Sequence, residues 1–164
     1  GTKLLFMGGE FGQTSEWSIE RGIDWHLTQY KPHQGVSDWV KALNEYYRNT
    51  TALYEQQFSP KGFEWIDHGD HLNSTLSYLR RGNESDDVVV VVVNFTPMVR
   101  HNFRLGVPLQ GDYKCALNSD DKEYGGTGNY TIETLSSTDG EWNGRPAFVE
   151  FSLPPLGVVV FEKV

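Results

Sequence analysis

The sequence predicts a mainly β chain, in which an antiparallel β-sandwich follows a short strand, a loop and a helix. Three observations support this fold class. After residue 60, short segments rich in β-branched and aromatic residues alternate with turns rich in glycine, asparagine and aspartate. One of these segments is an unbroken valine run, Val88–Val93, which indicates a central buried strand. Aromatic residues make up 13% of the chain, which suits a β-rich core.

The residues before position 60 predict a different organisation. Leu4–Met7 is a short apolar run that ends at two glycines, as is typical of a fully buried parallel strand. Residues 10–35 form a long loop, and loops of this length are usually functional or disordered. Ser37 is a candidate cap for a helix that continues to about Asn49, because the apolar positions follow helical spacing. Residues 50–54 predict one more helical turn.

A turn at Ser59–Gly62 marks the clearest boundary and separates this region from the predicted sandwich. Beyond it, Ser74–Arg80 alternates roughly between polar and apolar residues, so one face of that strand is expected to be wet. The run Val88–Val93 does not alternate, so we expect it to be central and covered on both faces. The predicted strands are Phe63–Ile66, Thr75–Arg80, Val88–Phe95, Asn102–Leu105, Tyr113–Leu117, Tyr130–Leu135, Ala147–Leu153 and Val158–Glu162.

The charge of the chain excludes several classes of partner. Its 164 residues carry a formal net charge of −8 at pH 7. An acidic surface repels phosphate backbones and anionic lipid, so we expect no binding to nucleic acid or to a membrane. A neutral polymer such as a glucan is unaffected by this charge. The longest apolar run, Val88–Val93, is far shorter than the ~20 residues that span a bilayer.

The chain has one cysteine, Cys115, so an intrachain disulfide is excluded. We interpret Cys115 as a buried structural thiol rather than a nucleophile, because it lies within a predicted strand. The lack of a disulfide framework fits a reducing compartment, and we expect a cytoplasmic location.

The residues that follow Leu4–Met7 carry the strongest functional signal. Groups just past the carboxyl end of a barrel strand point into the active face. Glu10 has this position and is expected to hydrogen-bond sugar hydroxyls or to orient a neighbouring group. Trp17 and Trp25, in the same loop, offer flat rings that stack on the apolar faces of pyranose rings. The alternative interpretation is structural, with Glu10 paired to an arginine and the tryptophans holding the loop in place.

Other candidate sites are weaker. Asp67, His68, Asp70 and His71 have the side chains of a metal site, but they lie between two predicted strands, so a hydrated hairpin turn is favoured. The sequence has no Gly-X-Ser-X-Gly nucleophile elbow. The cluster Gly125–Gly128 lacks the lysine and the helix of a phosphate-binding loop. We therefore predict no metal site and no cofactor.

An ordered series of motifs resembles one known family. The stretch Lys3–Gln13, with Glu16-Trp17 and Asp24-Trp25-His26-Leu27, resembles the eighth barrel strand and following loop of bacterial 1,4-α-glucan branching enzymes. These enzymes belong to the α-amylase superfamily. The resemblance covers essentially the whole chain. It continues through Gly35-Val36, Leu43-Asn44, Tyr47-Arg48, Ala52–Glu55, Gly62–Ile66, Leu79–Arg81, Asn94–Pro97, Leu117–Asp120, Tyr124–Gly128, Gly144–Pro146 and Leu153–Leu156.

The resemblance implies a division of the chain into two parts. Residues 1–59 are expected to be the end of a catalytic (β/α)8 barrel, comprising strand 8, its loop and helix 8. Residues 60–164 are expected to be an all-β carboxy-terminal domain, an antiparallel sandwich of Greek-key type. Within the first part, the loop motif implies substrate-binding residues, which are Glu10, Gln13, Trp17 and Trp25.

The activity implied by the resemblance is a retaining transglycosylation. An aspartate nucleophile cleaves an α-1,4 bond, a glutamate acts as acid and then base, and a glucan 6-hydroxyl accepts the chain to form an α-1,6 branch. In the family these carboxylates belong to earlier barrel strands, so no catalytic residue is assigned in this chain. We expect the fragment alone to be inactive and structural. The implied partners are an α-glucan, such as glycogen or amylose, and the remainder of the catalytic barrel.

The start of the chain also predicts a fragment, because Gly1-Thr2-Lys3 leads directly into an apolar strand without an initiator methionine. A barrel strand without its neighbours leaves backbone N–H and C=O groups unpaired. We therefore expect residues 1–35 to be poorly ordered, or to pack on the sandwich or on another copy.

Two alternative functions stay open at this point. A stand-alone carbohydrate-binding module would use exposed aromatic residues near the glycine-rich loop, such as Tyr124, Tyr130 and Trp142, as a platform for sugar. A related debranching or trehalose-releasing enzyme of the same superfamily would differ mainly in its barrel.

Overall fold

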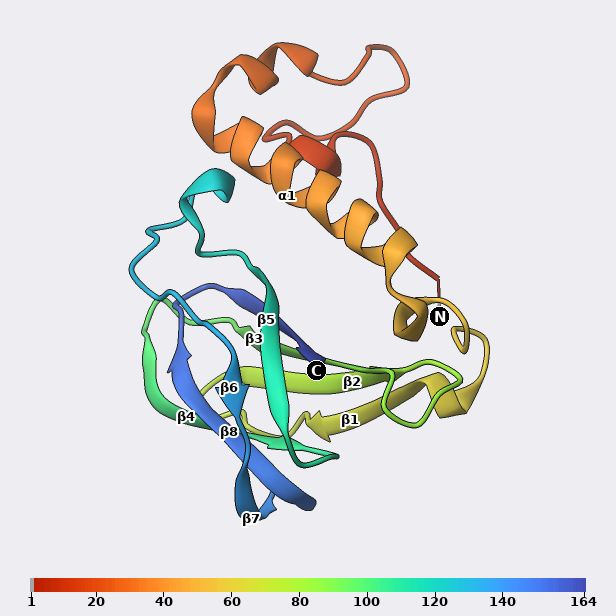
Figure 1. The fold of residues 1–164 in the computed structure, drawn as a ribbon. Helices are drawn as coiled ribbons and strands as arrows, with labels where there is room; N and C mark the ends of the chain where they lie inside the picture. Colours follow the sequence, from red (N-terminus) through yellow and green to blue (C-terminus); the bar gives the residue numbers. More distant parts are fainter. Residues whose placement is uncertain (1) are drawn as a thin grey trace.

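The computed structural model describes residues 2–164 and shows two antiparallel β-sheets packed face to face (Figure 1). One sheet has the strand order β1-β2-β3-β9-β5-β6, and the other has the order β4-β8-β7. The connections β3–β4, β4–β5, β6–β7 and β8–β9 cross between the sheets, as expected for a Greek-key sandwich. The strands are β1 (Phe63–Asp67), β2 (Thr75–Arg81), β3 (Val88–Asn94), β4 (Arg100–Val107), β5 (Asp112–Asn118), β6 (Leu135–Ser136), β7 (Thr138–Trp142), β8 (Arg145–Leu153) and β9 (Val158–Lys163).

The predicted mainly β fold is confirmed, and most predicted strands differ from the observed ones only at their ends. The exception is Tyr130–Leu135, of which only the last residue belongs to β6. The Tyr130 carbonyl accepts a hydrogen bond from the Asn118 side chain, so a side chain and not a ladder ties this segment to β5. Strand β7 is not among the predicted strands, because its exposed residues Thr138–Trp142 show no apolar alternation. It pairs with β8 across a hairpin turn at Asn143-Gly144.

The valine run lies in β3, between β2 and β9, near the centre of the larger sheet. Val90 and Val92 face the smaller sheet and belong to the main core of the sandwich. Val89 and Val91 face the opposite side and pack in a second cluster with Ala52. The prediction of a strand covered on both faces is therefore confirmed. Each fully buried valine stabilises the fold by about 1.5–3 kcal/mol.

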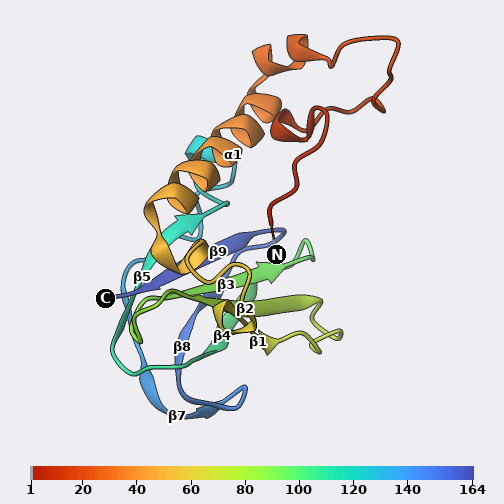
Figure 2. The same ribbon diagram turned by 90° about the vertical axis from the view of Figure 1, so that its right-hand side faces the viewer.

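The helix α1 (Lys31–Asn49) lies over the outer face of the larger sheet (Figures 1 and 2). It begins six residues before the predicted cap Ser37, which lies inside the helix. Pro32 stands in the first turn, where its fixed φ favours a helix and its missing N–H costs nothing. Tyr46 of α1 and the following turn η3 (Thr51–Leu53) cover the outer valines. Two further 3-10 turns are η4 (Pro60–Gly62) and η5 (Lys122–Tyr124).

The predicted strand Leu4–Met7 is wrong, since these residues pair with no described strand and all four side chains are exposed. A parallel strand needs a neighbour to satisfy its backbone groups, and none lies beside this segment among residues 2–164. The predicted loop over residues 10–35 is more regular than expected. It contains most of η1 (Gly9–Phe11), η2 (Trp25–Gln29) and the first turn of α1. In both ribbon views this region lies on the side of α1 away from the strands (Figures 1 and 2).

Candidate functional site

The loop before α1 is fixed to the helix by Phe11, whose side chain is fully buried. The ring of Phe11 packs against the ring of Trp25, with their centroids 5.1 Å apart. The Phe11 carbonyl oxygen lies 2.9 Å from Nδ1 of His33 in the first turn of α1. Phe11 therefore links η1, η2 and α1, and it holds the residues on either side of it in place.

The turn around Glu10 is closed by its own hydrogen bonds. The backbone N–H of Gln13 donates to the Gly8 carbonyl at 2.9 Å. The backbone N–H of Gly8 donates to Oε2 of Glu10 at 3.1 Å. Gly8 has a φ of 89°, and a Cβ there would lie 2.7 Å from Cβ of Gln13, so only glycine fits. One oxygen of the Glu10 carboxylate is thus used inside the turn.

The side chain of Gln13 is occupied within the loop. Its Oε1 accepts a hydrogen bond from the backbone N–H of Asp24 at 2.7 Å. Its Nε2 donates to the Ser15 carbonyl at 3.0 Å. The Ser15 hydroxyl in turn donates to the Asp24 carboxylate. Gln13 therefore joins the two ends of the loop, and its amide has a structural use that the sequence analysis did not anticipate.

The four predicted site residues do not line one common cavity. Glu10 is half-buried and lines a groove of about 670 Å³ along α1, together with the cationic residues Lys3, Lys41 and Arg48. Trp17 lies outside this groove, with its ring edge-on to Phe6 at 5.5 Å between centroids. Trp17 and Trp25 have 48% and 59% of their surface exposed, so both rings are open to a ligand.

The aromatic platform of the alternative interpretation is not formed. Tyr124 packs against Trp39 of α1, with ring centroids 4.9 Å apart. Trp142 ends β7, which lies at the opposite end of the sandwich from η5 and α1 (Figures 1 and 2). Tyr124 and Trp142 are therefore too far apart to share one ligand.

Burial and the neighbouring Glu123 raise the pKa of the Tyr124 hydroxyl to about 12.

Asp67 ends β1, and His68, Asp70 and His71 lie in the turn between β1 and β2, as favoured by the sequence. The carboxylate of Asp70 accepts hydrogen bonds from the Thr75 hydroxyl at 2.6 Å and from the Asn73 side chain at 2.9 Å. Burial alone would raise the pKa of Asp70, but these hydrogen bonds outweigh burial and hold the pKa below its ordinary value. Asp70 is therefore ionised, and its hydrogen bonds stabilise the hairpin turn.

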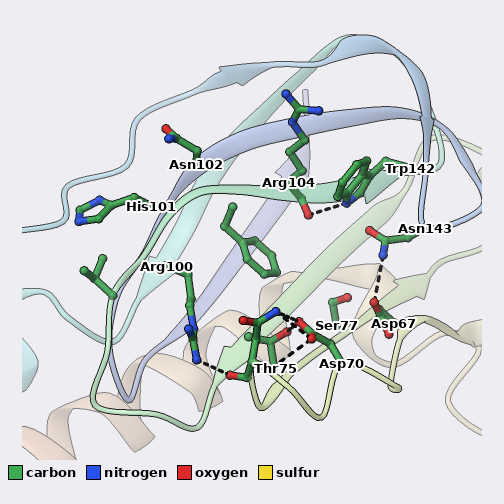
Figure 3. Close-up of a pocket in the computed structure, with 13 residues that line it drawn as sticks. Asp67, Asp70, Thr75, Ser77, Arg100, His101, Asn102, Arg104, Trp142 and Asn143 are labelled. Carbon is green, nitrogen blue, oxygen red and sulfur yellow. Dashed lines mark hydrogen bonds between the residues drawn. The ribbon is translucent and has the colours of Figure 1, made fainter.

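A second cavity, which the sequence analysis did not find, opens beside this hairpin (Figure 3). Its volume is about 590 Å³, and its walls come from β1, β2, β4 and the β7–β8 hairpin. The signal that could have revealed it is the pair Thr75 and Ser77, two polar residues that are buried along one face of β2.

Comparisons with known proteins agree on one family. The model of the alpha amylase C-terminal all-beta domain matches residues 65–164. The chain is 45% identical over 162 residues to the 1,4-alpha-glucan branching enzyme GlgB of Aquifex aeolicus (strain VF5), covering 99% of the chain and 26% of the relative. It is 48% identical over 159 residues to GlgB of Rubrobacter xylanophilus, covering 97% of the chain and 22% of the relative. For GlgB of Halothermothrix orenii the identity is 41%, over 99% of the chain and 26% of the relative.

These matches confirm the resemblance that the motifs indicated. The chain spans only about a quarter of the length of these curated relatives. Within residues 2–164, the structure has no helix that is both long and apolar enough to cross a membrane.

Proposed function

Because the chain belongs to the family of alpha amylase C-terminal all-beta domains, we propose that it is the carboxy-terminal part of a 1,4-α-glucan branching enzyme. The observation that carries this proposal is the identity of 41–48% to enzymes of that name over nearly the whole chain. The match includes the loop and helix as well as the sandwich, since 99% of the chain aligns with the Aquifex relative.

The whole enzyme would transfer a segment of α-1,4-glucan to a 6-hydroxyl and thereby form an α-1,6 branch. In such a retaining reaction one carboxylate is the nucleophile and a second carboxyl group is the acid and then the base. We assign both groups to the larger part of the enzyme that this chain does not cover. The chain alone would therefore have no branching activity.

Within this proposal the loop before α1 contacts the substrate. The exposed rings of Trp17 and Trp25 are suited to stack on the apolar faces of glucose units. Glu10 keeps one carboxylate oxygen beyond its bond to Gly8, and we assign it to a substrate hydroxyl. Gln13 acts differently, since both ends of its amide bind the loop backbone, and it sets the shape of the loop that the glucan meets.

The second partner in the proposal is the remainder of the catalytic barrel. Leu4–Met7 forms a run of exposed apolar residues, with 91% of the surface of Leu4 open to solvent. Val36 and Leu43 of α1 are exposed as well. Contiguous apolar surface of this kind marks an interface. We propose that residues 1–59 complete the barrel as strand 8, its loop and helix 8, and that residues 60–164 form the domain that supports it. Leu4–Met7, which forms no strand in this structure, would then become strand 8 only when neighbouring barrel strands pair with it.

A cytoplasmic location is also part of the proposal, since glycogen or amylose would be the substrate. It is supported by the single cysteine of the sequence, Cys115, which allows no intrachain disulfide and so fits a reducing compartment. Burial, with a smaller contribution from Asp121, raises the pKa of this thiol to about 12, so it stays protonated and unreactive.

A chimeric enzyme tests the proposal. The chain replaces the matching carboxy-terminal part of the Aquifex relative, and the formation of α-1,6 linkages on amylose is measured by proton NMR. We expect the chimera to form branches, whereas the same relative truncated before this part, and the chain alone, form none. A folded chimera that is as inactive as the truncated relative would contradict the proposal.

A further inference from the structure

The side chain of His33 reaches from the first turn of α1 back to the loop before the helix. In an α-helix each Cα–Cβ bond tilts toward the amino-terminal end, so a residue of the first turn meets the chain that enters the helix. Nδ1 of His33 lies 2.9 Å from the carbonyl oxygen of Phe11, 22 residues earlier in the sequence. Phe11 belongs to η1, which lies near the red end of the colour scale and beside α1 in both ribbon views (Figures 1 and 2). The contact therefore joins the beginning of the loop to the beginning of the helix.

The partner of His33 determines which ring nitrogen carries the proton. A carbonyl oxygen can only accept a hydrogen bond, so Nδ1 of His33 must be the donor. When the ring is neutral it has one proton, which is then on Nδ1, and Nε2 has none. The contact thus predicts a single tautomer of His33, which can be measured.

Phe11 transmits this restraint to two of the proposed substrate contacts. Its backbone directly follows Glu10, and its buried ring packs against the ring of Trp25. The Glu10 carboxylate has one oxygen bound to the backbone N–H of Gly8, so its second oxygen is aimed by the shape of this turn. A shift of the Phe11 backbone would therefore move the Glu10 carboxylate. Displacements of about 1 Å in an active site can lower the rate about 100-fold.

The sandwich fixes α1 close to the point where His33 stands. The buried Gly35 allows the backbone of the sandwich loop to approach, since a Cβ there would lie 2.5 Å from the Tyr124 carbonyl oxygen. About one turn further along the helix, the ring of Trp39 packs against the ring of Tyr124, with centroids 4.9 Å apart. His33 therefore belongs to a part of α1 that the sandwich holds in place.

We propose that His33 is a positioning residue for the loop before α1, and that through it the sandwich sets the place of the Glu10 carboxylate. The role of Glu10 at the substrate rests on the proposed function, whereas the contact between His33 and Phe11 does not. His33 itself does not touch the glucan and acts through Phe11. A histidine that only stabilised the fold would affect activity whether or not the Glu10 carboxylate were present, so the two roles predict different kinetics.

The test is a double-mutant cycle between His33 and Glu10 in the chimeric enzyme that carries this chain. His33→Ala removes the donor to Phe11, whereas His33→Asn keeps an N–H group near the place of Nδ1. Gln34→Ala is the matched control, because Gln34 is the exposed neighbour in the same turn of α1. The value of kcat/KM for amylose is measured for each change, with and without Glu10→Gln. The melting temperature of each variant reports whether it is folded.

We expect His33→Ala to lower kcat/KM about five- to tenfold, and His33→Asn and Gln34→Ala to keep it within about twofold. In the chimera that already carries Glu10→Gln, His33→Ala should cost less than about twofold, because the carboxylate that His33 positions is gone. An equal loss with and without Glu10→Gln would overturn the proposal and leave His33 a structural role. An unchanged kcat/KM in folded His33→Ala would overturn it as well.

The tautomer of His33 tests the contact independently of activity. NMR of the imidazole nitrogens in the 164-residue chain should place the proton of the neutral His33 ring on Nδ1. A proton on Nε2 would overturn the proposal, because Nδ1 could not then donate to Phe11. A starting chimera that forms no branches would contradict the proposed function instead, and the tautomer would still show whether His33 holds the loop.

Discussion

Tyr124, in the turn before the glycine-rich loop, packs its ring edge-on against Trp39 of α1, with centroids 4.9 Å apart and planes at 68°. The backbone of Tyr124 also lies directly over Gly35 of the same helix. The loop behind this contact is held by the buried carboxylate of Asp120, which accepts hydrogen bonds from the N–H and hydroxyl of Thr127. The sandwich thus contacts α1 at Gly35 and Trp39, close to His33, which meets the loop before the helix.

Gly35→Ala tests this contact between the sandwich and α1. In an open helix the change would stabilise the protein by about 1 kcal/mol, because alanine is the better helix former. Here a Cβ would lie 2.5 Å from the Tyr124 carbonyl oxygen, so the loop or the helix must move. We expect a net destabilisation of about 1–3 kcal/mol in urea unfolding. Gly22→Ala is the control, since a Cβ there meets no atom within 4 Å, and a stability equal to that of Gly35→Ala would contradict the contact.

Leu79→Ala tests the core between the two sheets. Leu79 is fully buried on β2, so its truncation removes apolar contacts and leaves a cavity. We expect unfolding to become easier by about 2–5 kcal/mol, measured by chemical denaturation. Leu72→Ala, in the exposed β1–β2 turn, should change stability by less than about 0.5 kcal/mol. Similar values for the two variants would show that β2 does not contribute to the core in this way.

The ion pairs of Glu64 predict a dependence of stability on pH. Glu64 on β1 binds Arg145 on β8 at 2.6 Å and Arg81 on β2 at 3.4 Å. Burial alone would raise the pKa of Glu64, but the two arginines outweigh burial and hold the pKa below its ordinary value of 4.5. A carboxyl group with a lowered pKa in the folded state stabilises the protein above pH 4.5, and this contribution is lost as the pH falls through the folded pKa.

Glu64→Gln should therefore lower the melting temperature at neutral pH and have little effect at about pH 3. The partners are partly exposed to solvent, so the loss should stay within about 1 kcal/mol. Glu133→Gln provides the control, because Glu133 is exposed and forms no ion pair within the described residues. A loss of stability at Glu64 that is the same at both pH values would contradict the ion-pair explanation.

The sandwich could be predicted from the sequence because its signals are local. The valine run Val88–Val93 has no polar face, so it had to be central and covered on both sides, and it is. Serine is a good cap, so the sequence predicts a start of α1 at Ser37, but Pro32 in the first turn sets the observed start. The fixed φ of Pro32 therefore determines where the helix begins, and the capping preference of Ser37 does not.

Features that depend on distant contacts could not be predicted in the same way. Leu4–Met7 has the pattern of a buried strand, yet whether it forms one depends on neighbours that no local pattern contains. Gln13 was expected at the substrate, but its amide meets Asp24, eleven residues away in the sequence. The cavity beside the β1–β2 turn is lined by residues from both sheets, so it depends on tertiary structure. Trp17 and Trp25 are exposed, and their role in stacking on sugar stays a prediction.

Gln13→Ala tests the internal use of that amide. The change removes the acceptor of the Asp24 N–H, so the loop should open more often around Asp24. We expect hydrogen exchange of the Asp24 amide to become about three- to tenfold faster, which corresponds to the loss of one hydrogen bond. Thr14→Ala is the control, because the exposed Thr14 side chain makes no hydrogen bond to any described residue. Unchanged exchange at Asp24 would show that Gln13 does not hold the loop.

We propose that this chain supplies the substrate-facing loop and none of the reacting carboxylates. The most direct test is kcat/KM of the chimeric enzyme for amylose when it carries Glu10→Gln. A substrate-binding role predicts a loss of about tenfold, with branching still measurable. A loss of about 10,000-fold or more would be that of a reacting carboxylate, and it would contradict the claim. An unchanged kcat/KM would contradict it as well, because Glu10 would then not contact the glucan.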